Sequence, residues 1–246
     1  MDELIRKHDG HLTRLTLNRA QKANALSAAL VEALLDAVEY AHGDGTRLLI
    51  LEGAGEHFCA GFVFGGFNEQ SEGDLALRFI RIETLLQTIH HAPFETLALA
   101  HGKIFGAGAD LVAACGVRVA APGTTFRMPG LQFGVVLGTR RLAHRIGADH
   151  ARAILPESRT FGADDALGLG FITKIAGADE WPSVIQHTLA NCELLTPSSS
   201  AALHRQTISD TRADDMAALA RSVSVPGLKE RIRLYREKSS TRERKS

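Results

Sequence analysis

The stretch TLALAHGKIFGAGAD, residues 96–110, holds the local pattern that decides the fold. Residues 96–100 are typical of a strand, residues 102–108 form a glycine-rich turn, and residues 109–115 predict a short buried helix. The same order occurs earlier, where the continuous apolar run 48–51 predicts a strand covered on both faces and the glycine-bearing turn 58–62 follows it. Repeated units of this kind predict a mainly parallel sheet with covering helices, an α/β fold.

The flanking sequence extends this pattern. Alternation over 12–17 predicts a half-buried strand, and Ser27 is placed to cap a helix that runs to about His42. Further strands are predicted at 117–120, 125–128 and 171–175, and further helices at 74–91, 141–146, 148–155, 163–167, 181–195, 198–208 and 228–238. We therefore expect a core over residues 1–195 and a C-terminal helical region over 196–246 that serves as a lid or in oligomerisation.

The C-terminal end is rich in basic residues. A solvated tail that frays is expected there. The residues concerned are Arg231, Arg233, Arg236, Lys238, Arg242, Arg244 and Lys245.

Composition narrows the class of protein. The chain has 246 residues, 45% of them hydrophobic, which suffices for a buried core and excludes a disordered chain. Lys+Arg and Asp+Glu are both 28, so no global charge favours nucleic acid or an anionic membrane as a partner. The charged start, the lack of a long apolar run and three scattered cysteines predict a cytoplasmic protein without disulfides or a zinc site.

Common cofactor and nucleophile motifs do not fit. Residues 53–58 resemble a dinucleotide fingerprint, but Phe58 stands where the third glycine would allow close packing of helix on strand. No phosphate-binding loop, nucleophile elbow or zinc-binding helix motif is present in the sequence. His90 and His91 end a predicted helix, where a structural role is favoured over a metal site. We expect no cofactor and no metal.

The two glycine-bearing turns remain as candidates for a site. Small residues let a backbone approach a ligand, and the second turn opens a helix whose free N–H groups point outward. One amide from each turn would be able to hold the oxyanion of a thioester carbonyl. Close-packed turns without any ligand would show the same residues. His57 and His101 flank the turns, either as an acid or base or as incidental loop residues.

In order and spacing, several short motifs resemble the crotonase superfamily, the enoyl-CoA hydratase/isomerase family. The resemblance covers about residues 12–175 and implies a spiral of ββα units ending in helices, an acyl-CoA ligand, and a homotrimer or homohexamer. The motifs lie at residues 17–19, 24–27, 58–61, 102–108, 134–147 and 166–172.

The same resemblance implies roles for particular residues. The oxyanion amides fall on Phe62 and on Ala107, where most members have glycine. Arg19, Lys22 and Ala60 fall where the family contacts CoA, although Arg19 and Lys22 also fit a solvated surface.

The acidic residues depart from the family pattern. Hydration uses two glutamates around one water, and the matching positions here are Asp110 and Gly130. A third position, an aspartate in some relatives, falls near Gly138. Asp110 is thus the candidate catalytic acid, or else a cap of the helix that it opens. An arginine among Arg127, Arg140 and Arg141 would be able to pair with a substrate carboxylate or with Asp110.

These expectations leave three functions open. The first is an acyl-CoA enzyme that isomerises, decarboxylates or hydrates through an enolate, with two-glutamate hydration in doubt. The second is an acyl-CoA-binding protein without catalysis, and the third is a hydrolase or dehalogenase with another nucleophile.

Overall fold

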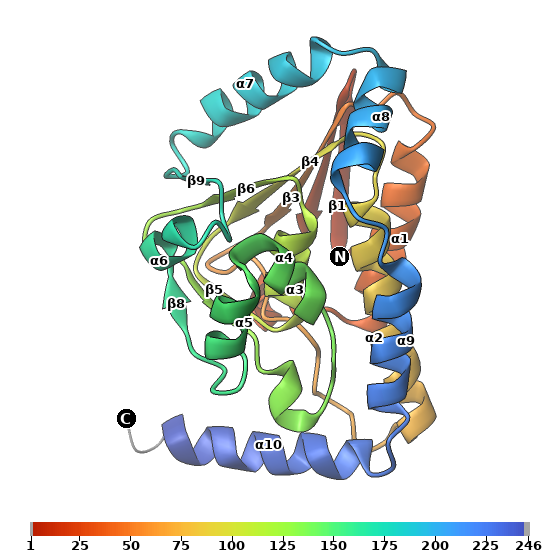
Figure 1. Cartoon of the computed structure of the whole chain (residues 1–246), viewed down its shortest axis with the longest axis vertical. Coiled ribbons are helices and arrows are strands. Elements are labelled where there is room, and N and C mark those ends of the chain that lie inside the picture. The colour runs from red at the N-terminus through yellow and green to blue at the C-terminus, as the bar shows by residue number, and fades with distance from the viewer. Residues whose placement is uncertain (1, 244–246) are drawn as a thin grey trace.

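The structure, a computed structural model, describes residues 2–243 and is shown in Figure 1. Its larger sheet has six strands in the order β1-β2-β3-β4-β6-β9, all pairs parallel except β1 with β2. A smaller sheet has the order β5-β7-β8. The strands are β1 (Leu4–Asp9), β2 (Leu12–Leu17), β3 (Leu48–Gly53), β4 (Glu95–Ala100), β5 (Lys103–Phe105), β6 (Val117–Ala120), β7 (Thr125–Arg127), β8 (Phe161–Gly162) and β9 (Lys174–Ile175). The predicted mainly parallel sheet is confirmed.

The helices cover the sheets from several sides. In Figure 1, α1, α2 and α9 run along one side, α7 lies at the opposite end from α10, and α3, α4 and α5 lie between. The helices are α1 (Ala28–Ala41), α2 (Glu72–His90), α3 (Ala107–Ala114), α4 (Thr139–Ile146), α5 (Ala148–Ile154), α6 (Ala163–Gly168), α7 (Trp181–Glu193), α8 (Pro197–Thr207), α9 (Arg212–Val223) and α10 (Leu228–Glu243), with 3-10 turns η1 (Ala20–Lys22) and η2 (Gly130–Phe133).

Strand β3 is covered on both faces, as its apolar run predicted. Leu49 and Leu51 belong to the large core under α1 and α2. Leu48 and Ile50 belong to a second core, which also contains Val184 of α7. Since side chains alternate across a strand, a strand between two apolar layers needs apolar residues at every position.

Helix boundaries follow local capping. The Ser27 side chain accepts a hydrogen bond from the Leu30 N–H (3.0 Å), so the predicted cap of α1 is confirmed. Helix α2 begins earlier than predicted, because Ser71 and Asp74 form a capping box. The predicted strand over 171–175 is wrong in extent, since only Lys174–Ile175 pairs with β6.

None of the described helices combines the length and hydropathy that crossing a bilayer requires.

The basic C-terminal segment is not a fraying tail over the residues whose side chains are described. Leu228 and Ile232 of α10 are fully buried. The Arg231 guanidinium donates to the carbonyls of Phe133 (3.3 Å) and Gly134 (3.1 Å), and so ties α10 to η2. The expectation fails because an apolar stripe within the basic sequence packs α10 onto the core. The side chains of Arg242, Arg244 and Lys245 lie outside this description.

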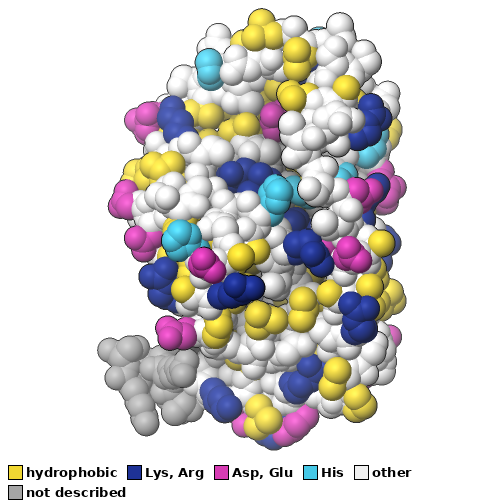
Figure 2. All heavy atoms as spheres, in the orientation of Figure 1, with side chains coloured by type: hydrophobic (Ala, Val, Ile, Leu, Met, Phe, Trp, Pro, Cys, Tyr) yellow, Lys and Arg dark blue, Asp and Glu magenta, His cyan; other side chains and the backbone are white. Residues whose placement is uncertain are grey.

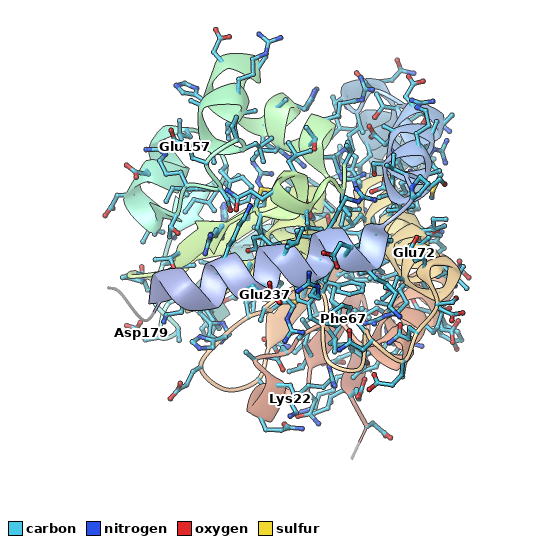
Figure 3. All side chains as sticks on the ribbon, turned by 90° about the horizontal axis from the view of Figure 1, so that it is seen from below. Lys22, Phe67, Glu72, Glu157, Asp179 and Glu237 are labelled. Atoms are coloured by element: carbon cyan, nitrogen blue, oxygen red, sulfur yellow. The ribbon has the colours of Figure 1, made fainter. Side chains whose placement is uncertain are left out.

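Helix α10 crosses one face of the molecule. Figure 3 shows it from below, with Phe67 and Glu237 along its length, and the Arg236 guanidinium lies 5.2 Å from the centre of the Phe67 ring. On the face shown in Figure 2, basic and acidic side chains are interspersed. The predicted boundary between residues 195 and 196 falls in the link from α7 to α8. The role of the C-terminal helical region as a lid or an oligomer contact stays a prediction.

Candidate active site

The two glycine-bearing turns pack directly on each other. The Phe105 N–H donates to the carbonyl of Cys59 (3.2 Å). A Cβ on Gly61, whose φ is +79°, would lie 2.3 Å from the Phe105 carbonyl oxygen and 3.1 Å from the Ala107 nitrogen. A Cβ on Gly108 would lie 2.2 Å from the Cys59 carbonyl oxygen. Glycine at both positions is therefore required for this contact.

The segment after β2 supports the first turn. The Asn24 amide donates to the carbonyls of Ala54 (2.8 Å) and His57 (2.7 Å). The Leu26 N–H donates to the carbonyl of Gly61 (2.7 Å). These bonds hold the backbone up to Phe62 in one conformation against the second turn.

Two backbone amides are left unpaired where the turns meet. Within the described part of the chain, neither the Phe62 N–H nor the Ala107 N–H donates to another group. Ala107 is the first residue of α3, whose N-terminal amides have no partner within the helix. Both residues line one cavity, so the structure brings the two predicted oxyanion residues together. Two unpaired donors that face one site can bind an oxygen that gains negative charge.

The cavity has a volume of about 240 Å³ and a mainly apolar wall. The Phe62 and Phe79 rings stack at 4.3 Å between centres, and Tyr235 of α10 closes one side. Among the described residues that line it, the only carboxyl group is that of Asp110 and the only cationic group is that of Arg127. Such a wall suits an acyl group better than a phosphate.

Asp110 lies one turn into α3 and is 3% exposed. Its Oδ1 atom has no hydrogen-bond partner among the described residues, and the N-terminus of α3 has no side-chain cap, so the helix-cap alternative for Asp110 is wrong. Burial raises the pKa of the Asp110 carboxyl to about 8, against the lowering influence of Arg141 and with a smaller raising influence of Glu83. At neutral pH this carboxyl is mostly protonated and close to its pKa, as a group that exchanges protons needs to be.

Gly138 makes room for the Asp110 carboxyl. A Cβ on Gly138 would lie 1.7 Å from Asp110 Oδ1, and the φ of Gly138 is +65°. Positions 110 and 138 are thus linked, because a side chain at 138 and the present placement of the Asp110 carboxyl exclude each other. Gly130 lines the same cavity and brings no side chain to it.

A buried ion pair that the sequence did not reveal lies beside Asp110. Arg141 of α4 forms two hydrogen bonds to Glu83 of α2, one of 3.0 Å from Nη1 to Oε1. The two side chains are 5% and 1% exposed. A signal was present, because Glu83 stands on the apolar face of α2 between Phe79 and Leu86. A charged residue at such a position requires a partner.

The three candidate arginines have different surroundings. Arg141 pairs with Glu83, and Arg140 pairs with Asp215 at 2.8 Å near the surface. Arg127 alone lines the cavity.

Of the three residues predicted to contact CoA, one lines the cavity and two lie outside it. Ala60 lines the cavity. Arg19 pairs with Glu3 (2.7 Å), and its guanidinium donates to the Ala25 carbonyl. Lys22 is exposed and lies at the edge of the view in Figure 3, away from α10.

Histidines and cysteines near the turns have structural contacts. His57 Nδ1 accepts from the Lys103 N–H (3.2 Å), and His101 Nε2 lies 3.0 Å from the Gly55 carbonyl oxygen. Neither histidine is part of the cavity wall.

Burial raises the pKa of the Cys59 thiol to about 12, so no thiolate nucleophile forms there at neutral pH. In the described part of the chain, no group of three or more His, Cys, Asp or Glu side chains is placed to hold a metal ion.

Comparison with known proteins matches this architecture. The family model described as enoyl-CoA hydratase/isomerase matches residues 7–244. A solved structure from Bordetella parapertussis, provisionally described as an enoyl-CoA hydratase/isomerase, is similar with a TM-score of 0.94 and 49% identity, covering 95% of this chain and 98% of that one.

Curated proteins with several activities are also similar. The "Probable enoyl-CoA hydratase echA6" of Mycobacterium leprae is 31% identical over 201 residues, which are 74% of this chain and 79% of that protein. The peroxisomal Delta(3,5)-Delta(2,4)-dienoyl-CoA isomerase of Arabidopsis thaliana is 26% identical over 193 residues, 72% of this chain and 69% of that protein. The predicted crotonase-like fold is confirmed, and the chain belongs to the enoyl-CoA hydratase/isomerase family.

Proposed function

We propose that this protein moves a proton between carbons of an acyl-CoA, with the thioester oxygen held by the amides of Phe62 and Ala107. One observation carries the proposal. Asp110, the single acid among the described residues of the cavity wall, lies buried and without a hydrogen-bond partner beside two unpaired amides. The reaction that suits one acid is the isomerisation of a 3-enoyl-CoA to a 2-enoyl-CoA.

The amides act on charge that develops during proton removal. When a base takes a proton from the carbon next to the thioester, the electron pair moves onto the carbonyl oxygen. The N–H groups of Phe62 and Ala107 would donate to that oxygen, and removing one such donor typically costs about 2.7–4 kcal/mol of transition-state stabilisation. Because the amides are held in turns that pack on each other, they need no rearrangement to do this.

Asp110 would be both base and acid. Its carboxylate removes the proton from C2, the double bond shifts, and the neutral carboxyl returns the proton to C4. The first step needs the ionised form, and the pKa is raised to about 8 by burial. Turnover at low substrate concentration should therefore rise with pH until about pH 8 and then level off.

Hydration is less well supported by this cavity. It requires a group that orients water and a second proton source. By the resemblance, Gly130 stands at the position of the second hydration glutamate, and Gly138 stands where some relatives have an aspartate. The space beside Gly138 that a side chain would need is taken by the Asp110 carboxyl.

For the CoA portion, we propose contacts from Ala60 at the cavity wall and from the exposed Lys22. Arg19 would have to leave Glu3 to reach a phosphate. A homotrimer or homohexamer is proposed from the resemblance, and the reaction as written needs no cofactor beyond the CoA thioester itself.

Turnover of two substrates tests the proposal. We expect 3-hexenoyl-CoA to be isomerised and crotonyl-CoA to be hydrated slowly or not at all. Asp110→Asn should lower isomerisation by about 10²–10⁴-fold, whereas the exposed Asp149→Asn serves as a matched control without effect.

Three results would contradict the proposal in different ways. Fast crotonyl-CoA hydration that survives in Asp110→Asn would show that another acid is used. Tight binding without turnover would favour the non-catalytic acyl-CoA-binding alternative. Unchanged turnover in a folded Ala107→Pro protein, which lacks that N–H, would exclude the proposed oxyanion site.

A further inference from the structure

Arg127 is the single cationic side chain among the described residues that line the cavity. It ends strand β7, where its backbone pairs with Phe105 of β5, a neighbour at a strand spacing of about 4.8 Å. The Arg127 carbonyl accepts a hydrogen bond from the Gly106 N–H (2.8 Å). The base of this side chain is therefore one residue removed from Ala107, the second oxyanion residue.

The Arg127 guanidinium is fixed on one edge and free on the other. Its Nε donates to the carbonyl (3.2 Å) and hydroxyl (3.1 Å) oxygens of Ser158. Ser158 is 3% exposed and has a left-handed φ of +50°, a conformation that costs energy for a residue with a Cβ. Nη1 and Nη2 of Arg127 have no partner among the described residues.

A guanidinium whose two Nη groups are free at the wall of an apolar cavity can bind an anion. Arg140 and Arg141 each have a carboxylate partner, but no described carboxylate lies within ion-pair distance of Arg127. The two Nη groups present the fork that binds a carboxylate with two parallel hydrogen bonds.

We infer that Arg127 binds a carboxylate on the acyl group of the substrate, so that the protein takes a carboxyacyl-CoA. This rests on the proposed function, which places the thioester at Phe62 and Ala107. The phosphates of CoA lie beyond the whole pantetheine arm from that thioester, so an anion beside Gly106 belongs to the acyl group. Because the Arg127 backbone neighbours the turn that holds the thioester, and its side chain lines the same cavity, the carboxylate would lie on the acyl chain within reach of that side chain.

Calorimetry on pairs of thioesters tests this inference without relying on turnover. Malonyl-, succinyl- and glutaryl-CoA are each compared with the neutral branched acyl-CoA of the same shape, such as isovaleryl-CoA for malonyl-CoA, and with free CoA. For at least one pair, the wild-type protein should bind the carboxylate member about 10- to 100-fold more tightly, the range expected of hydrogen bonds to a charged group. Arg127→Gln should remove this preference and leave the affinity for the neutral thioesters and free CoA within about twofold.

The exposed Arg152→Gln serves as a matched control and should bind like the wild type. Equal affinity of the wild type for both members of every pair would overturn the inference. So would an Arg127→Gln protein that loses affinity for free CoA and for all thioesters alike, since that result assigns Arg127 to a phosphate. Failure of the proposed catalysis would appear separately, as an Arg127-dependent preference in a protein that moves no proton.

Discussion

Replacing Asp110 by asparagine should change how the stability of the protein depends on pH. In the folded protein, burial raises the pKa of Asp110 to about 8, and an unfolded aspartate has a pKa near 3.8. Between these values the folded state keeps a proton that the unfolded state has lost. The free energy of unfolding of the wild type therefore falls as pH rises, and the loss is complete above about pH 8.

The magnitude follows from proton linkage. One extra bound proton in the folded state corresponds to about 1.4 kcal/mol per pH unit. Asparagine has a similar shape and cannot ionise, so this contribution disappears in Asp110→Asn. The free energy of unfolding of the variant, minus that of the wild type, should rise by about 2–3 kcal/mol between pH 5.5 and 7.5.

Urea unfolding followed by circular dichroism measures this difference. Both proteins are unfolded at a fixed protein concentration and at several pH values, so that other titrating groups cancel in the comparison. Asp149→Asn, at a fully exposed carboxylate, should follow the wild type at every pH. A difference between Asp110→Asn and wild type that stays constant over this pH range would refute the account of Asp110 as a buried, neutral acid.

Two further predictions concern the surroundings of Asp110. Gly138→Ala, whose Cβ would lie 1.7 Å from Asp110 Oδ1, should lower turnover as far as Asp110→Asn does. The control Gly147→Ala has a φ of +83° and nothing within 4 Å of the added Cβ, so it should cost only backbone strain of about 1–2 kcal/mol. Equal turnover in the two variants would contradict this prediction. Glu83→Ala should destabilise the protein by about 3–5 kcal/mol in urea unfolding, because Arg141 is left buried without a partner. Glu83→Leu combined with Arg141→Met should recover most of this loss. A double variant no more stable than Glu83→Ala would disprove the unpaired charge as the cause.

Local patterns predicted the centre of the fold well. The Ser27 cap and the two-sided burial of β3 depend on neighbouring residues and on alternation, which the sequence displays directly. Strand β1 was missed because its residues are mostly charged and exposed. It forms by antiparallel pairing with β2 across a tight turn at Gly10 and His11, and that pairing offsets its weak pattern.

The candidate site was only partly predictable, because part of it depends on contacts between residues distant in sequence. The turns that carry Phe62 and Ala107 are short stretches that the sequence displays directly, and the family resemblance predicted that their amides form one site. The contact of Gly138 with Asp110 and the pairing of Glu83 with Arg141 join residues distant in sequence. Tyr235 reaches the cavity from α10, a helix whose basic composition concealed its apolar stripe. A single-sequence pattern can mark Glu83 as a residue that needs a partner, but it does not identify Arg141 as that partner.

Exchange of hydrogen at C2 of a 3-enoyl-CoA in D₂O, followed by NMR, measures the proposed proton removal by Asp110 itself. It reports removal of the proton beside the thioester, whatever the later steps are. We expect the wild-type protein to incorporate deuterium at C2, and Asp110→Asn to slow this by about 10²–10⁴-fold. A wild-type protein that binds the thioester but exchanges no proton, or an Asp110→Asn protein that exchanges as fast as the wild type, would contradict this expectation.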